Sequence, residues 1–168
     1  MKALMTLLLA TSLAGVAIAQ NDKMSLHNGK SMEVKILKVG EFTVHYTFPG
    51  ETAEQVISKY MVGKVEYGSG RTEEITEKIT VNGKEDWEQV VILEDKAAAV
   101  GLVKKDEVRG KTSGLMSFHT AGSADKKSLR KLKESAAEMG CPFVLMTSDK
   151  DNMFTNQSIK KAVAYAYK

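Results

Sequence analysis

The stretch Ser123–Met146, SADKKSLRKLKESAAEMGCPFVLM, contains the clearest helix signal in the chain and the strand that follows it. Its apolar side chains recur every three or four residues, which is the period of a helix that packs against a core. They are Leu129, Leu132, Ala136 and Met139. The opposite side of this helix is basic and carries Lys126, Lys127, Arg130, Lys131 and Lys133. An amphipathic helix joined to an apolar strand predicts a helix packed on a sheet.

Residues at both ends of this segment indicate where the helix begins and ends. Ser123 is a suitable N-cap, and Asp125 places negative charge in the first turn, where it interacts favourably with the helix dipole. Gly140 stands at the position of a left-handed C-cap, and Pro142 prevents the helix from continuing. We therefore expect a helix from Ser123 to just before Gly140, followed by a strand at Phe143–Met146.

Other short elements are expected around this helix. Three more strands are predicted, at Val90–Leu93, Ala97–Val103 and Val108–Thr112. Two polar segments, Thr112–Ser123 and Ser148–Thr155, are predicted to be loops. Apolar residues alternate along Ser158–Lys168, which favours an edge strand over a helix.

The N-terminal half has the pattern of short strands separated by tight turns. Asn28-Gly29 is typical of a hairpin turn. Alternation over Met32–Val39 predicts a strand with a bulge near its end, and Phe42–Phe48 alternates with one aromatic side. Glu51–Met61 fits either a helix or a strand with a short turn. Val62–Tyr67 and Ile75–Val81 continue the β-pattern, and turns about ten residues apart predict a small barrel or sandwich.

The first nineteen residues have the composition of a secretory signal peptide. Lys2 is the only charged residue before Asp22, an apolar run follows it, and Ala17-Ile18-Ala19 resembles a signal-peptidase site. The run is too short for a membrane span, and no cysteine follows it to receive a lipid. We therefore expect export, cleavage after Ala19 and no transmembrane segment in the mature chain.

Charge is distributed unevenly along the mature chain. Residues 20–95 contain 9 Lys and Arg against 14 Asp and Glu, whereas residues 96–168 contain 14 against 7. Two ordinary solvated faces are the favoured interpretation; the alternatives are that the two halves attract each other or that the basic half meets an anionic surface. We predict a β-barrel-like domain at 24–82, an α+β domain at 88–168, and Trp87 at their junction.

No catalytic or metal-binding motif stands out. Gly110-Lys111-Thr112 lacks the earlier glycine of a phosphate-binding loop, because Lys105 occupies that position. His27, His45 and His119 are scattered without the spacing of metal ligands. We therefore expect no cofactor and no metal site, and the small net charge of +3 disfavours nucleic acid as a partner.

Cys141 is the only cysteine, so the chain contains no internal disulfide. It precedes Pro142 and an apolar run, a context that predicts a buried thiol of raised pKa with little thiolate. The alternative is a reactive thiol. His119, in the loop predicted at Thr112–Ser123, would then have to fold over the start of the strand to act as the base.

Two parts of the sequence resemble known folds. Residues 24–75 resemble the small Sm-like or SH3-like barrels of exported proteins from Bacteroidetes-type bacteria; the matching segments are Leu26–Lys30, Ile36–Val39, Val44–Tyr46, Ile57–Tyr60 and Val65–Gly70. Residues 88–148, with Val108-Arg109-Gly110 and the ending Ala136–Leu145, resemble the YbjQ-type family and the related fold of the envelope-stress sensor lipoprotein RcsF. The resemblance implies an SH3-like β-barrel followed by an α+β module that can form oligomers.

The functional properties of those families do not carry over to this chain. The disulfide cysteines of the sensor are missing, and Cys141-Pro142 replaces the usual small pair. The heavy-metal label of the YbjQ-type family has no ligand cluster here to support it.

These observations predict an α+β protein that is exported and binds a partner, without catalysis, in the periplasm or at the cell envelope. The candidate residues for binding a protein or an anionic envelope component are Lys126, Lys127, Arg130, Lys131 and Lys133. The structural interpretation, in which they form the solvated side of a helix that packs on the core, is favoured for this surface. One alternative is a hydrolase or thiol-dependent enzyme that uses Cys141 or the loop at residues 112–123. The other is a structural protein that assembles into a homo-oligomer.

Overall fold

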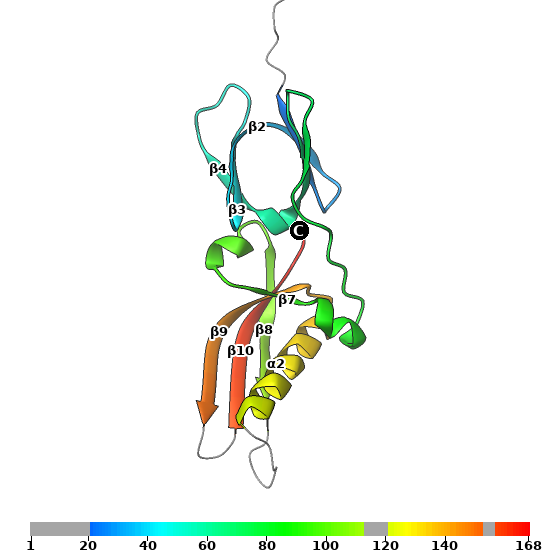
Figure 1. The fold of residues 1–168 in the computed structure, drawn as a ribbon, viewed down its shortest axis with the longest axis vertical. Helices are drawn as coiled ribbons and strands as arrows, with labels where there is room; N and C mark the ends of the chain where they lie inside the picture. Colours follow the sequence, from blue (N-terminus) through cyan, green and yellow to red (C-terminus); the bar gives the residue numbers. More distant parts are fainter. Residues whose placement is uncertain (1–20, 113–120, 153–156) are drawn as a thin grey trace, which may run out of the picture.

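The computed structural model describes residues 21–112, 121–152 and 157–168. Two β-sheets lie end to end along the long axis of the molecule, and one long helix covers a face of the second sheet (Figure 1). This combination of sheets with one main helix confirms the α+β class. The expected signal peptide at residues 1–19 lies outside the described residues.

The N-terminal sheet has six strands that all pair antiparallel with their neighbours, in the order β4-β3-β2-β1-β5-β6. The strands are β1 (Asp22–Leu26), β2 (Ser31–Val39), β3 (Thr43–Thr47), β4 (Gln55–Ser58), β5 (Val62–Glu66) and β6 (Thr72–Glu74). A 3-10 turn, η1 (Lys59–Met61), joins β4 to β5. The sheet curls round its core (Figure 1), but no pairing between described strands joins β4 to β6, so it is open at this point.

Most of the predictions for this half are confirmed. The hairpin turn at Asn28-Gly29 joins β1 to β2, and the register of β2 against β3 shifts between Ile36 and Lys38, as a bulge requires. Residues 51–61 form a strand with a short turn, not a helix. The strand expected over Ile75–Val81 is wrong. This segment passes between the two sheets without strand pairing, and its apolar side chains pack into the cores on either side.

The C-terminal sheet has four strands in the order β7-β9-β10-β8. The strands are β7 (Val91–Leu93), β8 (Val103–Lys111), β9 (Phe143–Asn152) and β10 (Gln157–Ala166). β7 runs parallel to β9, and the other pairs are antiparallel. Helix α2 (Ala121–Glu138) packs across β8 and β10 and against a 3-10 segment, η2 (Lys84–Gln89).

Three strand predictions in this half need correction. β10 is a central strand, not an edge strand, because it pairs with β9 on one side and with β8 on the other. Its small residues Ala162 and Ala164 lie fully buried where α2 approaches the sheet. The loop predicted at Ser148–Thr155 is wrong as far as Asn152, because β9 continues to that residue and pairs with β10. Ala97–Val103 begins as a 3-10 turn, η3 (Lys96–Ala99), because the carboxylate of Asp95 accepts the Ala97 N–H.

The sequence predicts the C-terminal end of α2 correctly but not its N-terminal end. The helix begins at Ala121, so Ser123 lies within its first turn and the predicted N-cap is wrong. The predicted C-terminus is confirmed, with Gly140 at a φ of +65°. The Gly140 N–H donates to the Ala137 carbonyl and the Cys141 N–H donates to the Ala136 carbonyl. This pair of bonds is a Schellman motif, which a glycine in the left-handed region makes possible.

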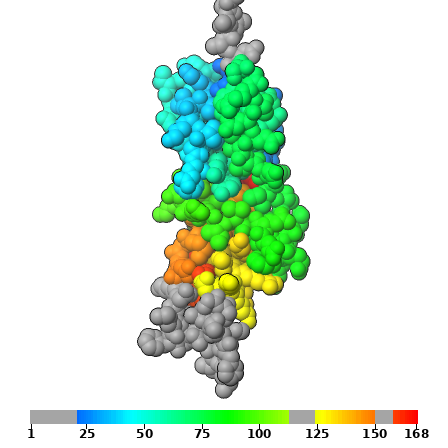
Figure 2. Space-filling model, in the orientation of Figure 1, coloured from blue at the N-terminus to red at the C-terminus, as the bar shows by residue number. Residues whose placement is uncertain are grey.

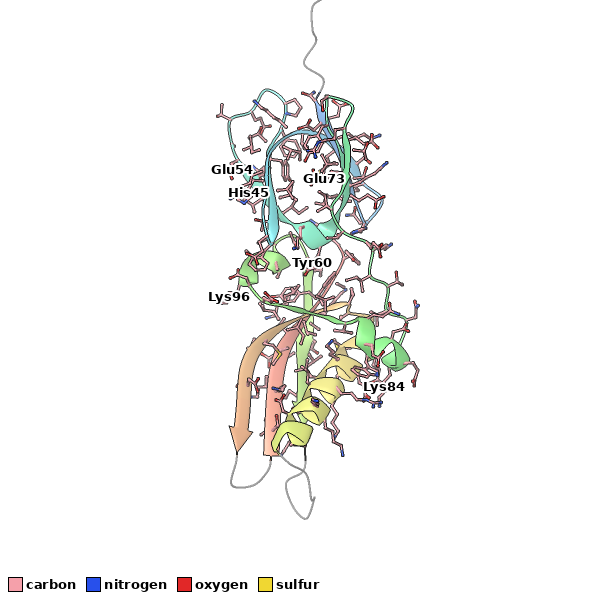
Figure 3. The ribbon with its side chains drawn as sticks, in the orientation of Figure 1. His45, Glu54, Tyr60, Glu73, Lys84 and Lys96 are labelled. Carbon is pink, nitrogen blue, oxygen red and sulfur yellow. The ribbon has the colours of Figure 1, made fainter. Side chains whose placement is uncertain are left out.

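Aromatic side chains join the two sheets. Tyr60, labelled in Figure 3, lies 5.3 Å from Phe143 between ring centroids, and Phe143 lies 5.3 Å from Tyr167. Tyr167 also meets the His27 ring edge-on, and its hydroxyl accepts the Ile79 N–H at 3.0 Å. The sheets therefore share a packed contact, which we call the junction cluster; the domain limits 24–82 and 88–168 stay predictions.

Candidate functional site

The five basic residues expected to meet a partner lie on the side of α2 that faces away from the sheet. We call them the basic face: Lys126, Lys127, Arg130, Lys131 and Lys133. The helix is held in this orientation because Leu132 and Ala136, on its other side, are fully buried against the sheet. Four members of the basic face are exposed and Lys133 is half-buried.

A surface hollow of about 770 Å³ opens beside the basic face. Trp87, Leu129 and Glu134 line it together with all five residues of the basic face. Trp87 belongs to η2, which lies next to α2 on the same face of the molecule (Figure 2). It was expected at the junction of the two halves but packs instead against the core beneath α2. This first hollow thus combines an apolar floor with a rim of cations.

Arg130 is held in place by two contacts. Its guanidinium carbon lies 5.0 Å from the centre of the Trp87 ring, and its Nε donates to Glu134 Oε1 at 2.7 Å. This hydrogen bond lowers the pKa of Glu134, so the carboxylate is charged near neutral pH. Among the described residues, no hydrogen bond or ion pair occupies the two terminal nitrogens of Arg130. The guanidinium is therefore oriented with its outer edge available for an anion.

A second hollow, of about 390 Å³, adjoins the first. It is lined by Lys84, Arg109, Lys111, Lys131, Glu134, Ser135 and Glu138. Lys131 and Glu134 line both hollows. Lys131 Nζ also donates to the Lys111 carbonyl at 3.1 Å, which links α2 to β8. Lys84, which Figure 3 places beside α2, lies 3.5 Å from Glu134.

In the structure, most of the acidic excess of residues 20–95 belongs to one segment of the C-terminal half of the fold. Residues 84–95 carry one basic residue against five acidic ones, which accounts for most of the acidic excess of residues 20–95. The acidic residues are Glu85, Asp86, Glu88, Glu94 and Asp95. This segment includes η2, which packs against α2, so the opposite charges meet within the C-terminal unit. Burial lowers the pKa of Lys133 there, and the charge of Glu88 opposes that shift.

Gly110-Lys111-Thr112 has a structural role in the packing of α2. A Cβ atom on Gly110 would lie 1.8 Å from the Ser128 carbonyl oxygen, so only glycine lets the helix backbone approach β8 this closely. Thr112 is buried, and its hydroxyl accepts the Ser158 N–H at 3.0 Å. Lys111 lines the second hollow. The sequence around Gly110 does not predict this close approach, because Ser128 lies in a distant segment of the chain.

A buried lysine lies near the N-terminal part of α2. Lys160 Nζ lies 2.5 Å from Asp125 Oδ1 and 2.6 Å from Asp149 Oδ2, and its side chain is only 5% exposed. Burial alone would lower the pKa of Lys160, but the hydrogen bonds to the two carboxylates outweigh it and raise the pKa. Its ammonium is therefore charged, and it cannot serve as a base for the buried hydroxyls of Ser128 and Ser158, which lie 2.7 Å apart.

Cys141 is fully buried and its thiol contacts the Met139 carbonyl at 3.6 Å. Burial raises the pKa of this thiol, and the charge of Lys105 opposes the shift. Little thiolate forms at neutral pH, which agrees with the inert thiol expected from the sequence.

The histidines do not gather into one site. His27 Nε2 lies 3.0 Å from Thr76 Oγ1, whereas His45, labelled with Glu54 in Figure 3, contacts that carboxylate at 2.5 Å. His119 lies outside the described residues. Within the described part of the chain, no group of three potential ligands could hold a metal ion.

Comparison of this chain with protein-family models, curated proteins and solved structures found no match. None of the helices in the described ranges has the length and apolarity needed to cross a membrane. The surface that combines charge, a hollow and an oriented arginine is the basic face of α2.

Proposed function

We propose that this chain is an exported, non-enzymatic protein that holds an anionic component of the cell envelope on the basic face of α2. The observation that supports this most is the first hollow, where five cationic side chains surround Trp87 and Leu129. Like charges gathered in a concave site repel one another and attract an anion. The hollow therefore favours a ligand that neutralises the rim and covers the apolar floor.

Envelope binding can be measured by sedimenting the protein with isolated cell envelopes. Replacing Lys126 and Lys127 by glutamine should weaken binding by about tenfold or more, since a lysine near an anionic surface contributes about 1 kcal/mol. The matched control replaces Lys35 and Lys38, two exposed lysines of β2 in the other sheet, and should bind as the unchanged protein does. Equal binding by both variants would contradict the proposal.

Export is proposed from the composition of the first nineteen residues. The chain expressed in a Gram-negative host should be recovered from the periplasmic or envelope fraction with Gln20 as its first residue. N-terminal sequencing of the purified protein tests this. A protein that retains Met1 and stays in the cytoplasm would contradict it.

A catalytic function has less support. A thiol-dependent enzyme would need an accessible thiolate, and Cys141 is buried with a raised pKa. Residues 113–120 of the loop proposed at 112–123 lie outside the described residues. Assembly into a homo-oligomer stays a prediction, for which sedimentation would give a mass several times that of the monomer.

We also propose that the six-stranded sheet is related to SH3-like barrels. Its successive antiparallel strands, its curl and the bulge in β2 support this relationship. The resemblance of the C-terminal half to the YbjQ-type and RcsF-like fold likewise stays a proposal.

A further inference from the structure

We infer that the ligand of this surface is an acidic polysaccharide chain, which runs from the first hollow across Lys131 into the second. This inference rests on the proposed function and specifies the class of its ligand. The positions and chemistry of the two hollows carry it.

The arrangement of the hollows favours a linear ligand. The first lies between α2 and η2, and the second extends to β8 through Arg109 and Lys111. Because Lys131 and Glu134 line both, one flexible chain can pass from one to the other. A small anion would fill only one hollow. A flat lipid surface would touch the rim but would not follow both depressions.

The apolar residues of the first hollow also argue against a lipid surface. Trp87 and Leu129 are half-buried at its floor, below a rim of long basic side chains. A helix that lies on a membrane inserts its apolar side, whereas Leu132 and Ala136 of α2 are fully buried against the sheet. The exposed side of α2 is therefore mainly basic, which suits an anionic ligand in the hollow better than insertion into a lipid surface.

The polar groups along this path suit a sugar acid better than a polyphosphate. Arg130 presents its outer guanidinium edge, which matches two oxygens of a carboxylate or of a phosphate, so the neighbouring acceptors make the distinction. Glu134, Glu138 and Ser135 lie among the cations of the second hollow and offer oxygen acceptors. A uronic-acid chain has hydroxyl groups between its carboxylates, and these can donate to the acceptors. Polyphosphate has no hydroxyl along its chain to donate to Glu134 and Glu138, so these two carboxylates would only repel it.

The fluorescence of Trp87 provides a direct test, because it is the only tryptophan in the chain and lines the first hollow. The mature protein is titrated with polygalacturonate, neutral dextran, polyphosphate and phosphatidylglycerol vesicles. Polygalacturonate should change the emission to saturation, and added salt should reverse the change. Dextran should leave it unchanged, and polyphosphate and vesicles should bind at least about tenfold more weakly than polygalacturonate.

The second hollow is tested by the double variant Arg109→Gln with Lys111→Gln. It should bind polygalacturonate about tenfold more weakly than the unchanged protein. We expect trigalacturonate to occupy only the first hollow and therefore to bind the variant and the unchanged protein equally well. The matched control, Lys104→Gln with Lys105→Gln, removes two exposed charges of the same strand that line neither hollow. It should keep full affinity. If the first variant fails to fold, the affinity of the unchanged protein for galacturonate chains of increasing length decides, with a rise expected beyond the trimer.

The outcomes separate this inference from the proposed function. Tighter binding of vesicles or polyphosphate than of polygalacturonate would overturn the polysaccharide assignment and leave an anion-binding basic face. Equal affinity of the β8 variant and its control, or an affinity that does not rise with chain length, would overturn the path between the hollows. Absence of binding to all three anions would overturn both.

Discussion

Gly110 is the residue on which the position of α2 depends most directly. A methyl group there would overlap the Ser128 carbonyl, so Gly110→Ala must push the helix away from β8. We expect a loss of roughly 1–3 kcal/mol in the free energy of unfolding, the usual range for overpacking a core. Gly83→Ala is the matched control, because a Cβ atom at Gly83 meets nothing within 4 Å. Urea denaturation measures both, and equal stability of the two variants would contradict this account.

The Cys141 thiol should react slowly in the folded protein. It is fully buried and its pKa is raised, so both access and thiolate are limited. We expect a small thiol reagent to label native protein at least about a hundredfold more slowly than protein unfolded in urea. Labelling of the native protein at the rate of free cysteine would show that the thiol is accessible and would support the thiol-enzyme alternative.

For single residues, features that depend on sequence neighbours were easier to predict than contacts between distant segments. The C-cap at Gly140 and the buried thiol at Cys141 follow from a few neighbouring residues. The close approach at Gly110 and the carboxylates around Lys160 could not be predicted in that way, because the contacting residues come from distant segments. One sequence signal was available for Lys160. In a strand it lies on the same face as Ser158 and Ala162, which are both buried beneath the helix.

At the scale of elements, Lys160 connects α2 to the sheet through Asp125 and Asp149. Lys160→Ala should lower the free energy of unfolding by roughly 1–3 kcal/mol, because two carboxylates lose their shared cation. Lys160→Met, which keeps the apolar stem, should lose less. Lys105→Ala, at an exposed position of β8, serves as the control and should change stability by less than about 0.5 kcal/mol.

The ion pair also predicts a dependence on alkaline pH. The native pKa of Lys160 is raised above its usual value of 10.5, so its contribution is complete below that pH and is lost as the pH rises through the native pKa. The stability of the unchanged protein should therefore fall more steeply above pH 10.5 than that of Lys160→Met. Parallel stability curves for the two proteins would contradict the assignment.

Periodicity predicted elements well where one side of the element is buried. The main helix and the hairpin strands of the N-terminal sheet are confirmed for this reason. It failed at Ile75–Val81 and Ala97–Val103, where apolar residues fill the space between elements or follow a capped 3-10 turn. It also misjudged the position of β10, because small alanines on one side resemble an exposed strand when the covering helix is not considered.

At the scale of the whole molecule, the junction cluster makes contact between the sheets depend on pH. Burial first, and then the charge of Lys78, lower the pKa of His27 below its usual value of 6.5, and a hydrogen bond with Thr76 opposes the shift. The unfolded chain thus binds a proton at higher pH than the native protein does. Stability should fall as the pH drops from 6.5 through the lowered native pKa.

Thermal melting of the unchanged protein and of His27→Gln between pH 7.5 and 5 tests this prediction. The variant should lose less stability over that range, because it has no imidazole to protonate beside Tyr167 and Lys78. An identical decrease in melting temperature for both proteins would show that other groups cause the acid sensitivity.

The candidate surface was predicted in part from the sequence. Its five basic residues follow from helical periodicity, which separates them from the apolar side. The hollow beside Trp87 and the extension to Arg109 and Lys111 could not be predicted, because they depend on how η2 and β8 pack around the helix.

The central claim, that the basic face of α2 binds an anion of the envelope, is tested most directly by lysine footprinting. The protein is acetylated briefly with and without isolated envelopes, and mass spectrometry reports the modification of each lysine. We expect protection at Lys126, Lys127 and Lys131, with unchanged rates at Lys35 and Lys38 of the other sheet. Protection at Lys35 and Lys38 with full reactivity of the basic face would contradict the claim.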